Sequence, residues 1–105
     1  MYWVIVHHIR PVGPDMDFLG NTENIREAVE MAQSEKVRED CEHCKSGTRT
    51  EIYKNERGAM DIADLRREER IFEYLRITPE KWQVRWFNNV AEAEFNAQFK
   101  SSSTT

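Results

Sequence analysis

An apolar run near the N-terminus limits most strongly how this chain can fold. Residues 2–9 are rich in β-branched and aromatic side chains, and Pro11, Gly13 and Pro14 follow shortly afterwards. Because β-branched and aromatic residues favour strands while proline and glycine interrupt them, we predict a buried strand that ends in a loop. The run is too short for a signal peptide or a membrane span, and no basic residue precedes it. We therefore expect a cytoplasmic protein without a membrane partner.

The segment after this loop carries the clearest helical pattern. The loop itself is expected to cover residues 10–21 and to be held to the core by Phe18 and Leu19. After a cap at Asn21 and Thr22, apolar residues recur at the spacing of an amphipathic helix. These apolar residues are Ile25, Ala28, Val29 and Ala32. The stripe slips around residues 33–34 and restarts at Val37, so we expect the helix to bend or break there and to reach the two cysteines in its last turn.

The middle of the chain combines a strand with an ambiguous segment. Residues 48–54 have strand composition, and residues 55–58 resemble a hairpin turn that would return the chain as a short strand over 59–63. Strong helix formers dominate residues 61–75, although the apolar residues of that segment would also fit a strand. We favour a helix there.

The C-terminal third admits two interpretations. Apolar and polar residues alternate strictly over residues 81–87, which favours a strand with one buried face, and a final helix over residues 90–99 follows it. The alternative is a single helix over residues 79–99, beginning at a proline. We favour the strand followed by the helix. Residues 100–105 have nothing to bury, so we expect them to be disordered.

These elements predict one small α+β domain. With 105 residues, the chain is long enough for a single core that buries roughly two-thirds of the unfolded surface. We expect residues 1–99 to form this domain, with a short, mostly antiparallel sheet covered by two or three helices. Trp3, Trp82 and Trp86 are expected to lie at least partly in its core.

The only two cysteines, Cys41 and Cys44, lie in the sequence Cys-Glu-His-Cys. A redox pair needs a helix N-terminus or neighbouring cations, whereas this pair is expected in the frayed last turn at the C-terminus of the helix and has acidic neighbours. The favoured interpretation is two reduced thiols and no cofactor. The alternative is a small zinc-stabilised module that uses both cysteines as ligands. A histidine together with a carboxylate, or a second copy of the chain in a homodimer, would then complete the zinc site.

The charge of the chain is concentrated in one segment. The net charge is −4, and residues 22–42 account for all of it, with seven acidic and three basic residues. Elsewhere the charges are mixed, so no basic face forms for a nucleic acid, and nucleic-acid binding is disfavoured. An acidic surface on the predicted helix instead suits a basic partner.

The chain contains no pattern typical of an active site. His7 or His8 could act as a general base, but neither can be paired with a nucleophile from the sequence, and the four glycines form no phosphate loop. We therefore predict a non-catalytic protein-interaction module, a small regulator or inhibitor that binds a macromolecular protein partner through its acidic helix. The predicted contact residues are Glu23, Glu27, Glu30, Glu35 and Glu39.

Overall fold

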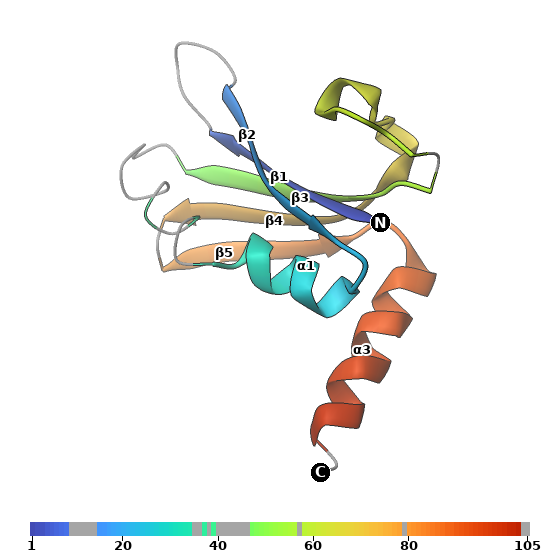
Figure 1. Ribbon diagram of the computed structural model, residues 1–105. Helices are drawn as coiled ribbons and strands as arrows, with labels where there is room; N and C mark the ends of the chain where they lie inside the picture. The colour runs from blue at the N-terminus through green and yellow to red at the C-terminus, as the bar shows by residue number, and fades with distance from the viewer. Residues whose placement is uncertain are drawn as a thin grey trace.

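The computed structural model describes residues 1–8, 15–34, 37, 39, 47–56, 58–78 and 80–103. These residues form a five-stranded antiparallel sheet in the order β2-β1-β3-β4-β5, together with two α-helices (Figure 1). The strands are β1 (Tyr2–His8), β2 (Asp15–Thr22), β3 (Thr48–Lys54), β4 (Arg70–Thr78) and β5 (Lys81–Trp86). The helices are α1 (Ile25–Ala32) and α3 (Asn89–Ser103), and the 3₁₀ turns are η1 (Ile62–Asp64) and η2 (Arg67–Glu69). The predicted small α+β domain with an antiparallel sheet is confirmed.

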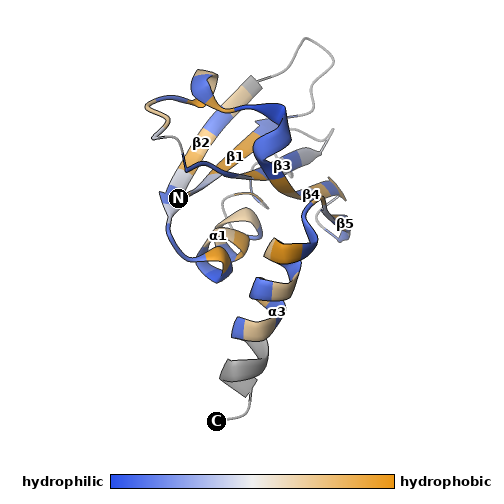
Figure 2. Ribbon diagram, turned by 90° about the vertical axis from the view of Figure 1, so that its right-hand side faces the viewer, coloured by the Kyte–Doolittle hydropathy of each residue, from blue (hydrophilic) through white to orange (hydrophobic). Residues whose placement is uncertain are grey.

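The two faces of the sheet have different coverings. Helices α1 and α3 lie on one side, which we call the helical face, and the turns η1 and η2 lie over the opposite face (Figures 1 and 2). The core lies on the helical face, where Val4, Ile25, Ile52 and Phe72 are almost completely buried. Burying large apolar side chains of this kind stabilises a domain by roughly 1.5–3 kcal/mol each.

Asn24 begins helix α1. Its side-chain Oδ1 accepts hydrogen bonds from the backbone N–H groups of Arg26 and Glu27, at 2.8 and 3.2 Å. All the apolar residues of the predicted stripe are buried against the sheet. The amphipathic helix is therefore confirmed, although its cap is Asn24 and not the predicted Asn21 and Thr22.

The loop predicted over residues 10–21 is wrong in its second half, which forms β2. This strand lies at an edge of the sheet and pairs with β1 along its whole length. Its acidic residues and its glycine disfavour a strand locally, but charged residues suit an edge that faces water. Leu19 packs against the core as expected, whereas Phe18 contacts the ring of Trp3 and stays 43 % exposed.

The helix predicted over residues 61–75 is also wrong, because β4 occupies the end of this segment. β4 lies between β3 and β5 and pairs with both. Differences in helix propensity are less than about 1 kcal/mol per ordinary residue. Pairing on both edges and burial of Phe72 and Tyr74 outweigh that local preference.

The hairpin turn and return strand predicted over residues 55–63 are wrong. A longer connection between β3 and β4 takes their place. Asn55 is only 3 % exposed and holds this connection at both ends. Its Nδ2 donates a hydrogen bond to Oε2 of Glu69 at 2.8 Å, and its Oδ1 accepts one from the backbone N–H of Ala59 at 2.8 Å. These bonds keep the turns over the sheet.

The C-terminal third contains the strand and helix that the sequence favours, β5 and α3. The alternative single helix over residues 79–99 is therefore wrong. Helix α3 is described as far as Ser103, so it enters the segment 100–105 that the sequence predicts to be disordered. No helix within the described ranges is long and apolar enough to cross a membrane.

Two of the three tryptophans contribute to buried structure. Trp3 is 8 % exposed, and the ring of Trp86 lies 4.8 Å from that of Phe72 and 5.5 Å from that of Phe95. Trp82, by contrast, is 52 % exposed, so its predicted place in the core is wrong. Both tryptophans lie on the edge strand β5, but Trp86 packs against Phe95 of helix α3, whereas the ring contact of Trp82 among the described residues is with Tyr74, at 5.7 Å.

Candidate functional site

The acidic residues predicted to bind a partner are exposed wherever the structure describes them. Glu23, Glu27, Glu30 and Glu39 are all exposed, and Glu35 lies outside the described residues. Because the apolar stripe of α1 faces the sheet, the carboxylates of this helix face solvent.

A shallow hollow lies beside α1, and we call it the α1 hollow. Its volume is about 460 Å³. The residues that line it are Asn21, Thr22, Glu27, Glu30, Met31 and Ser34. Glu27 Oε2 accepts a hydrogen bond from Thr22 Oγ1 at 2.6 Å, while Glu30 Oε1 lies 3.4 Å from Nε of Arg26. Met31 is half-buried and packs against the core, so the hollow combines two carboxylates with an apolar surface.

Cys41 and Cys44, the alternative zinc ligands, lie outside the described residues, so the zinc site stays a prediction. The histidines that might complete such a site point to opposite faces of β1. On the helical face, Nε2 of His8 lies 2.9 Å from Oδ2 of Asp17. Among the residues that the structure describes, no three histidine, cysteine, aspartate or glutamate side chains gather as a metal site.

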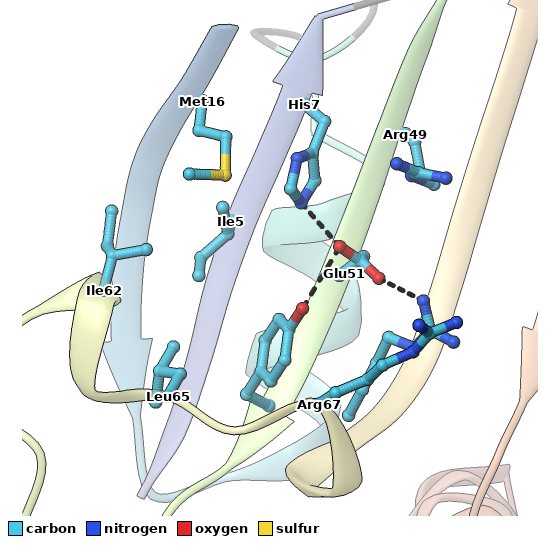
Figure 3. A pocket seen from close by; sticks show the side chains of 10 residues that line it. Ile5, His7, Met16, Arg49, Glu51, Ile62, Leu65 and Arg67 are labelled. Carbon is cyan, nitrogen blue, oxygen red and sulfur yellow. Dashed lines mark hydrogen bonds and ion pairs between the residues drawn. The ribbon is translucent and has the colours of Figure 1, made fainter. Parts of the chain in front are cut away.

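A second cavity lies on the opposite face of the sheet, beside the turns η1 and η2, and we call it the arginine cavity (Figure 3). Its volume is also about 460 Å³. The residues that line it are Ile5, His7, Met16, Arg49, Glu51, Tyr53, Ile62, Leu65, Arg67 and Arg70. Of these residues, only His7 was a candidate from the sequence.

Glu51 lies at the centre of the arginine cavity and is only 3 % exposed. Its Oε1 lies 2.5 Å from Nε2 of His7 and accepts a hydrogen bond from the Tyr53 hydroxyl at 3.2 Å. Its Oε2 accepts a hydrogen bond from Nη1 of Arg70 at 2.7 Å. The contact with His7 is close but lacks hydrogen-bond direction, so it is an ion pair whenever His7 is protonated. Both carboxylate oxygens are therefore engaged by neighbours.

These contacts set the charge of each group in the cluster. Burial by itself raises the pKa of Glu51, but the contacts with His7 and Arg70 outweigh burial and lower the pKa to about 2. Burial and the Glu51 carboxylate together raise the pKa of Tyr53 to about 12. The hydrogen bond to Glu51 raises the pKa of Arg70. Near neutral pH the cavity thus holds a carboxylate, a neutral phenol and a charged guanidinium.

Strand pairing brings this cluster together. Arg49, Glu51 and Tyr53 alternate along β3, so their side chains point to the same face, and Arg70 lies opposite Tyr53 on β4. The available signal was Glu51 itself, because a carboxylate in the middle of a strand needs a cation if it is buried. Because a helix was predicted over residues 61–75, the pairing of β4 with β3 that brings Arg70 to Glu51 was not foreseen.

The two hollows carry opposite charge. Glu27 and Glu30 line the α1 hollow, whereas Arg49, Arg67 and Arg70 line the arginine cavity. No family model, no curated protein and no solved structure matches the chain. The α1 hollow suits a cationic group, and the arginine cavity suits an anionic one.

Proposed function

We propose that the protein is a non-catalytic protein-interaction module, a small regulator or inhibitor that binds a basic surface of a protein partner. The observation that carries this proposal is the α1 hollow, where Glu27 and Glu30 stand beside the apolar surface of Met31. Lysine and arginine side chains combine an apolar stem with a cationic end, and they match this arrangement. One basic side chain of the partner would lay its stem on Met31 and bring its charge to the two carboxylates.

The wider charge distribution supports the same interface. The acidic segment over residues 22–42 contributes the whole net charge of −4, and its described acids at Glu23 and Glu39 are exposed as well. Such a field attracts a basic partner over distance and increases its rate of association. Exposed charges are screened beyond about 10 Å at 0.1 M salt, so the interaction should weaken as salt increases.

Charge reversal tests the proposal. We would capture partners with the full chain at low salt, identify them by mass spectrometry, and measure binding to the Glu27→Lys/Glu30→Lys variant. Binding to a true partner is expected to fall by at least about tenfold, which corresponds to roughly 1.4 kcal/mol. The substitutions leave the buried stripe of α1 intact, so the loss of folding stability should be no more than about 1 kcal/mol.

The matched control is Glu68→Lys/Glu80→Lys. It changes the net charge equally and replaces two exposed glutamates that do not line the α1 hollow. A partner of this interface should bind the control variant about as tightly as the original chain. If the partner binds both variants equally well at low salt, the α1 surface is not the interface and the proposal is wrong.

A further inference from the structure

The arginine cavity carries more positive charge than its own residues neutralise. Arg49, Arg67 and Arg70 line it together with a single carboxylate, Glu51. Arg70 is shared between Glu51, at 2.7 Å, and Glu73, whose Oε2 lies 3.9 Å from its Nη1. Arg49 and Arg67 therefore supply the excess positive charge, in a chain whose net charge is −4. Because both oxygens of Glu51 are already engaged inside the protein, this carboxylate presents no unpaired oxygen to a ligand.

The three guanidinium groups have different roles. Arg70 is held in place, since its Nη1 donates to Glu51 at 2.7 Å and its guanidinium carbon lies 4.2 Å from the centre of the Phe87 ring. Arg49 and Arg67 are exposed, and among the described residues neither side chain has a hydrogen-bond or ion-pair partner. The cavity therefore contains one positioned cation and two cations that are available to a ligand.

The other wall of the cavity is apolar. Its residues are Ile5, Met16, Ile62 and Leu65. Figure 3 shows these four on one side, with Arg49 and Arg67 on the other side, beyond Glu51. Met16 is 49 % exposed, so part of this apolar wall is open to water in the free protein. A hollow with one apolar wall and one cationic wall suits an amphipathic anion.

We propose that the arginine cavity binds a phosphate monoester with a flat apolar body, an aryl phosphate or a nucleoside monophosphate. Guanidinium groups bind phosphate oxygens through paired, charge-assisted hydrogen bonds. A phosphate monoester carries a charge of about −1.5 to −2 at pH 7 and three acceptor oxygens, so it can engage both Arg49 and Arg67, whereas a carboxylate has a single charge and two oxygens. The volume of about 460 Å³ lies within the range of roughly 300–1,000 Å³ that is usual for small-molecule sites.

The test is an NMR titration of the full chain with phenyl phosphate, which joins a phosphate to one ring. Saturable shifts are expected for backbone amides of β1 and β3 around Ile5 and Glu51, and for those of η1 and η2. Inorganic phosphate, which lacks the ring, and phenol, which lacks the phosphate, should each bind at least about tenfold more weakly, because each engages only one wall. Equal binding of phenyl phosphate and inorganic phosphate would overturn the amphipathic site.

The variant Arg49→Gln/Arg67→Gln removes the two available cations. Both residues are exposed and unpaired within the described residues, so the variant should melt like the original chain while it binds phenyl phosphate at least about tenfold more weakly. The matched control pairs Arg66→Gln with Arg85→Gln, because both arginines are exposed, neither lines the cavity, and the net charge changes equally. We avoid changing Arg70, because its loss would leave the buried Glu51 without a cation.

Two results would contradict this site. One is the absence of saturable shifts up to about 10 mM phenyl phosphate, because a ligand that binds more weakly than this does not define a site. The other is equal weakening by the cavity variant and the control variant, which would reflect net charge alone. A parallel titration with adenosine monophosphate distinguishes an aryl phosphate from a nucleoside monophosphate as the preferred ligand. The two probes share the phosphate and differ in the group that meets the apolar wall.

Discussion

Arg70 donates a hydrogen bond from Nη1 to Oε2 of Glu51 at 2.7 Å, joining the neighbouring strands β3 and β4 inside the arginine cavity. A buried carboxylate without a partner is strongly destabilising, so this bond and the contact with His7 allow Glu51 to remain ionised in the sheet. Both residues line the same cavity as the apolar wall, so their bond also fixes where a cation stands relative to that wall.

The first prediction concerns acid stability and Glu51. Its pKa lies at about 2 in the folded protein, below the ordinary value of 4.5. Because folding lowers this pKa, the ionised carboxylate stabilises the fold above about pH 4.5, and this stabilisation is lost as the pH falls toward 2. Glu51→Gln should therefore reduce the free energy of unfolding at pH 7 by on the order of 3 kcal/mol, and the difference should shrink steadily below pH 4.5.

Urea unfolding of both proteins between neutral and acidic pH measures this difference. The control is Glu56→Gln, since Glu56 is exposed and its one ion-pair partner among the described residues is the half-exposed Lys54, at 3.6 Å. The control should change the free energy of unfolding by less than about 1 kcal/mol at any pH. A constant difference between Glu51→Gln and the original chain across the acidic range would show that the Glu51 pKa is not lowered.

The second prediction concerns the tyrosines. Burial and the carboxylate of Glu94 raise the pKa of Tyr2 to about 12, and burial with Glu51 raises that of Tyr53 to about 12. Because these pKa values are raised on folding, both phenols stabilise the fold below about pH 10, and that stabilisation is lost as the pH rises toward 12. The ultraviolet absorbance of tyrosinate should therefore lack the contributions of Tyr2 and Tyr53 until the protein unfolds in alkali. Ionisation of both phenols near pH 10 in the folded protein would refute this.

The third prediction compares two glycines with positive φ. Gly47 has φ 96°, and a Cβ added there would lie 2.5 Å from the carbonyl oxygen of Arg76 on β4. Gly58 has φ 76°, and a Cβ there would have no described atom within 4 Å. We expect Gly47→Ala to cost on the order of 3 kcal/mol, and Gly58→Ala only about 1 kcal/mol, the cost of the left-handed backbone alone. Thermal melting of the two variants makes the comparison, and equal losses would contradict the close approach at β4.

The fourth prediction separates the two interpretations of Cys41 and Cys44. Their acidic surroundings in the sequence and the missing second pair of ligands favour reduced thiols without metal. The Cys41→Ser/Cys44→Ser variant should then melt within a few degrees of the original chain, which corresponds to less than about 1 kcal/mol. Native mass spectrometry should find a metal-free chain. Stoichiometric zinc, with a large loss of stability on chelation, would instead establish the zinc-stabilised module.

Local patterns predicted those elements in which propensity and burial agree. The apolar run of β1 is buried on both faces, and the periodic stripe of α1 is buried against the sheet. The alternation of β5 predicted a strand correctly, but the face expected to be buried is largely exposed. β2 and β4 were missed, because pairing with the neighbouring strands of the sheet overrides what their own residues prefer. The acidic surface of α1 could be predicted from the sequence, because it is the side of a single helix that lies opposite the buried apolar stripe.

The arginine cavity was out of reach because it depends on register. Glu51 and Arg70 are separated by 19 positions in the chain, and they meet only because β4 pairs with β3. The register between these strands shifts at Ile52 and Tyr53, and a slip of one residue would turn the Arg70 side chain to the helical face. No pattern within either strand specifies such a shift.

The sheet order has a consequence for how the chain folds during synthesis. β1 lies between β2 and β3, so its second edge is paired only after Thr48–Lys54 has been made. Until then the most apolar strand of the protein presents one open edge, a state that favours pairing with other chains. The acids of β2 lie on the far side of β1 and leave that edge unprotected. We therefore expect the protein to be most prone to aggregate during synthesis, before β3 has been made.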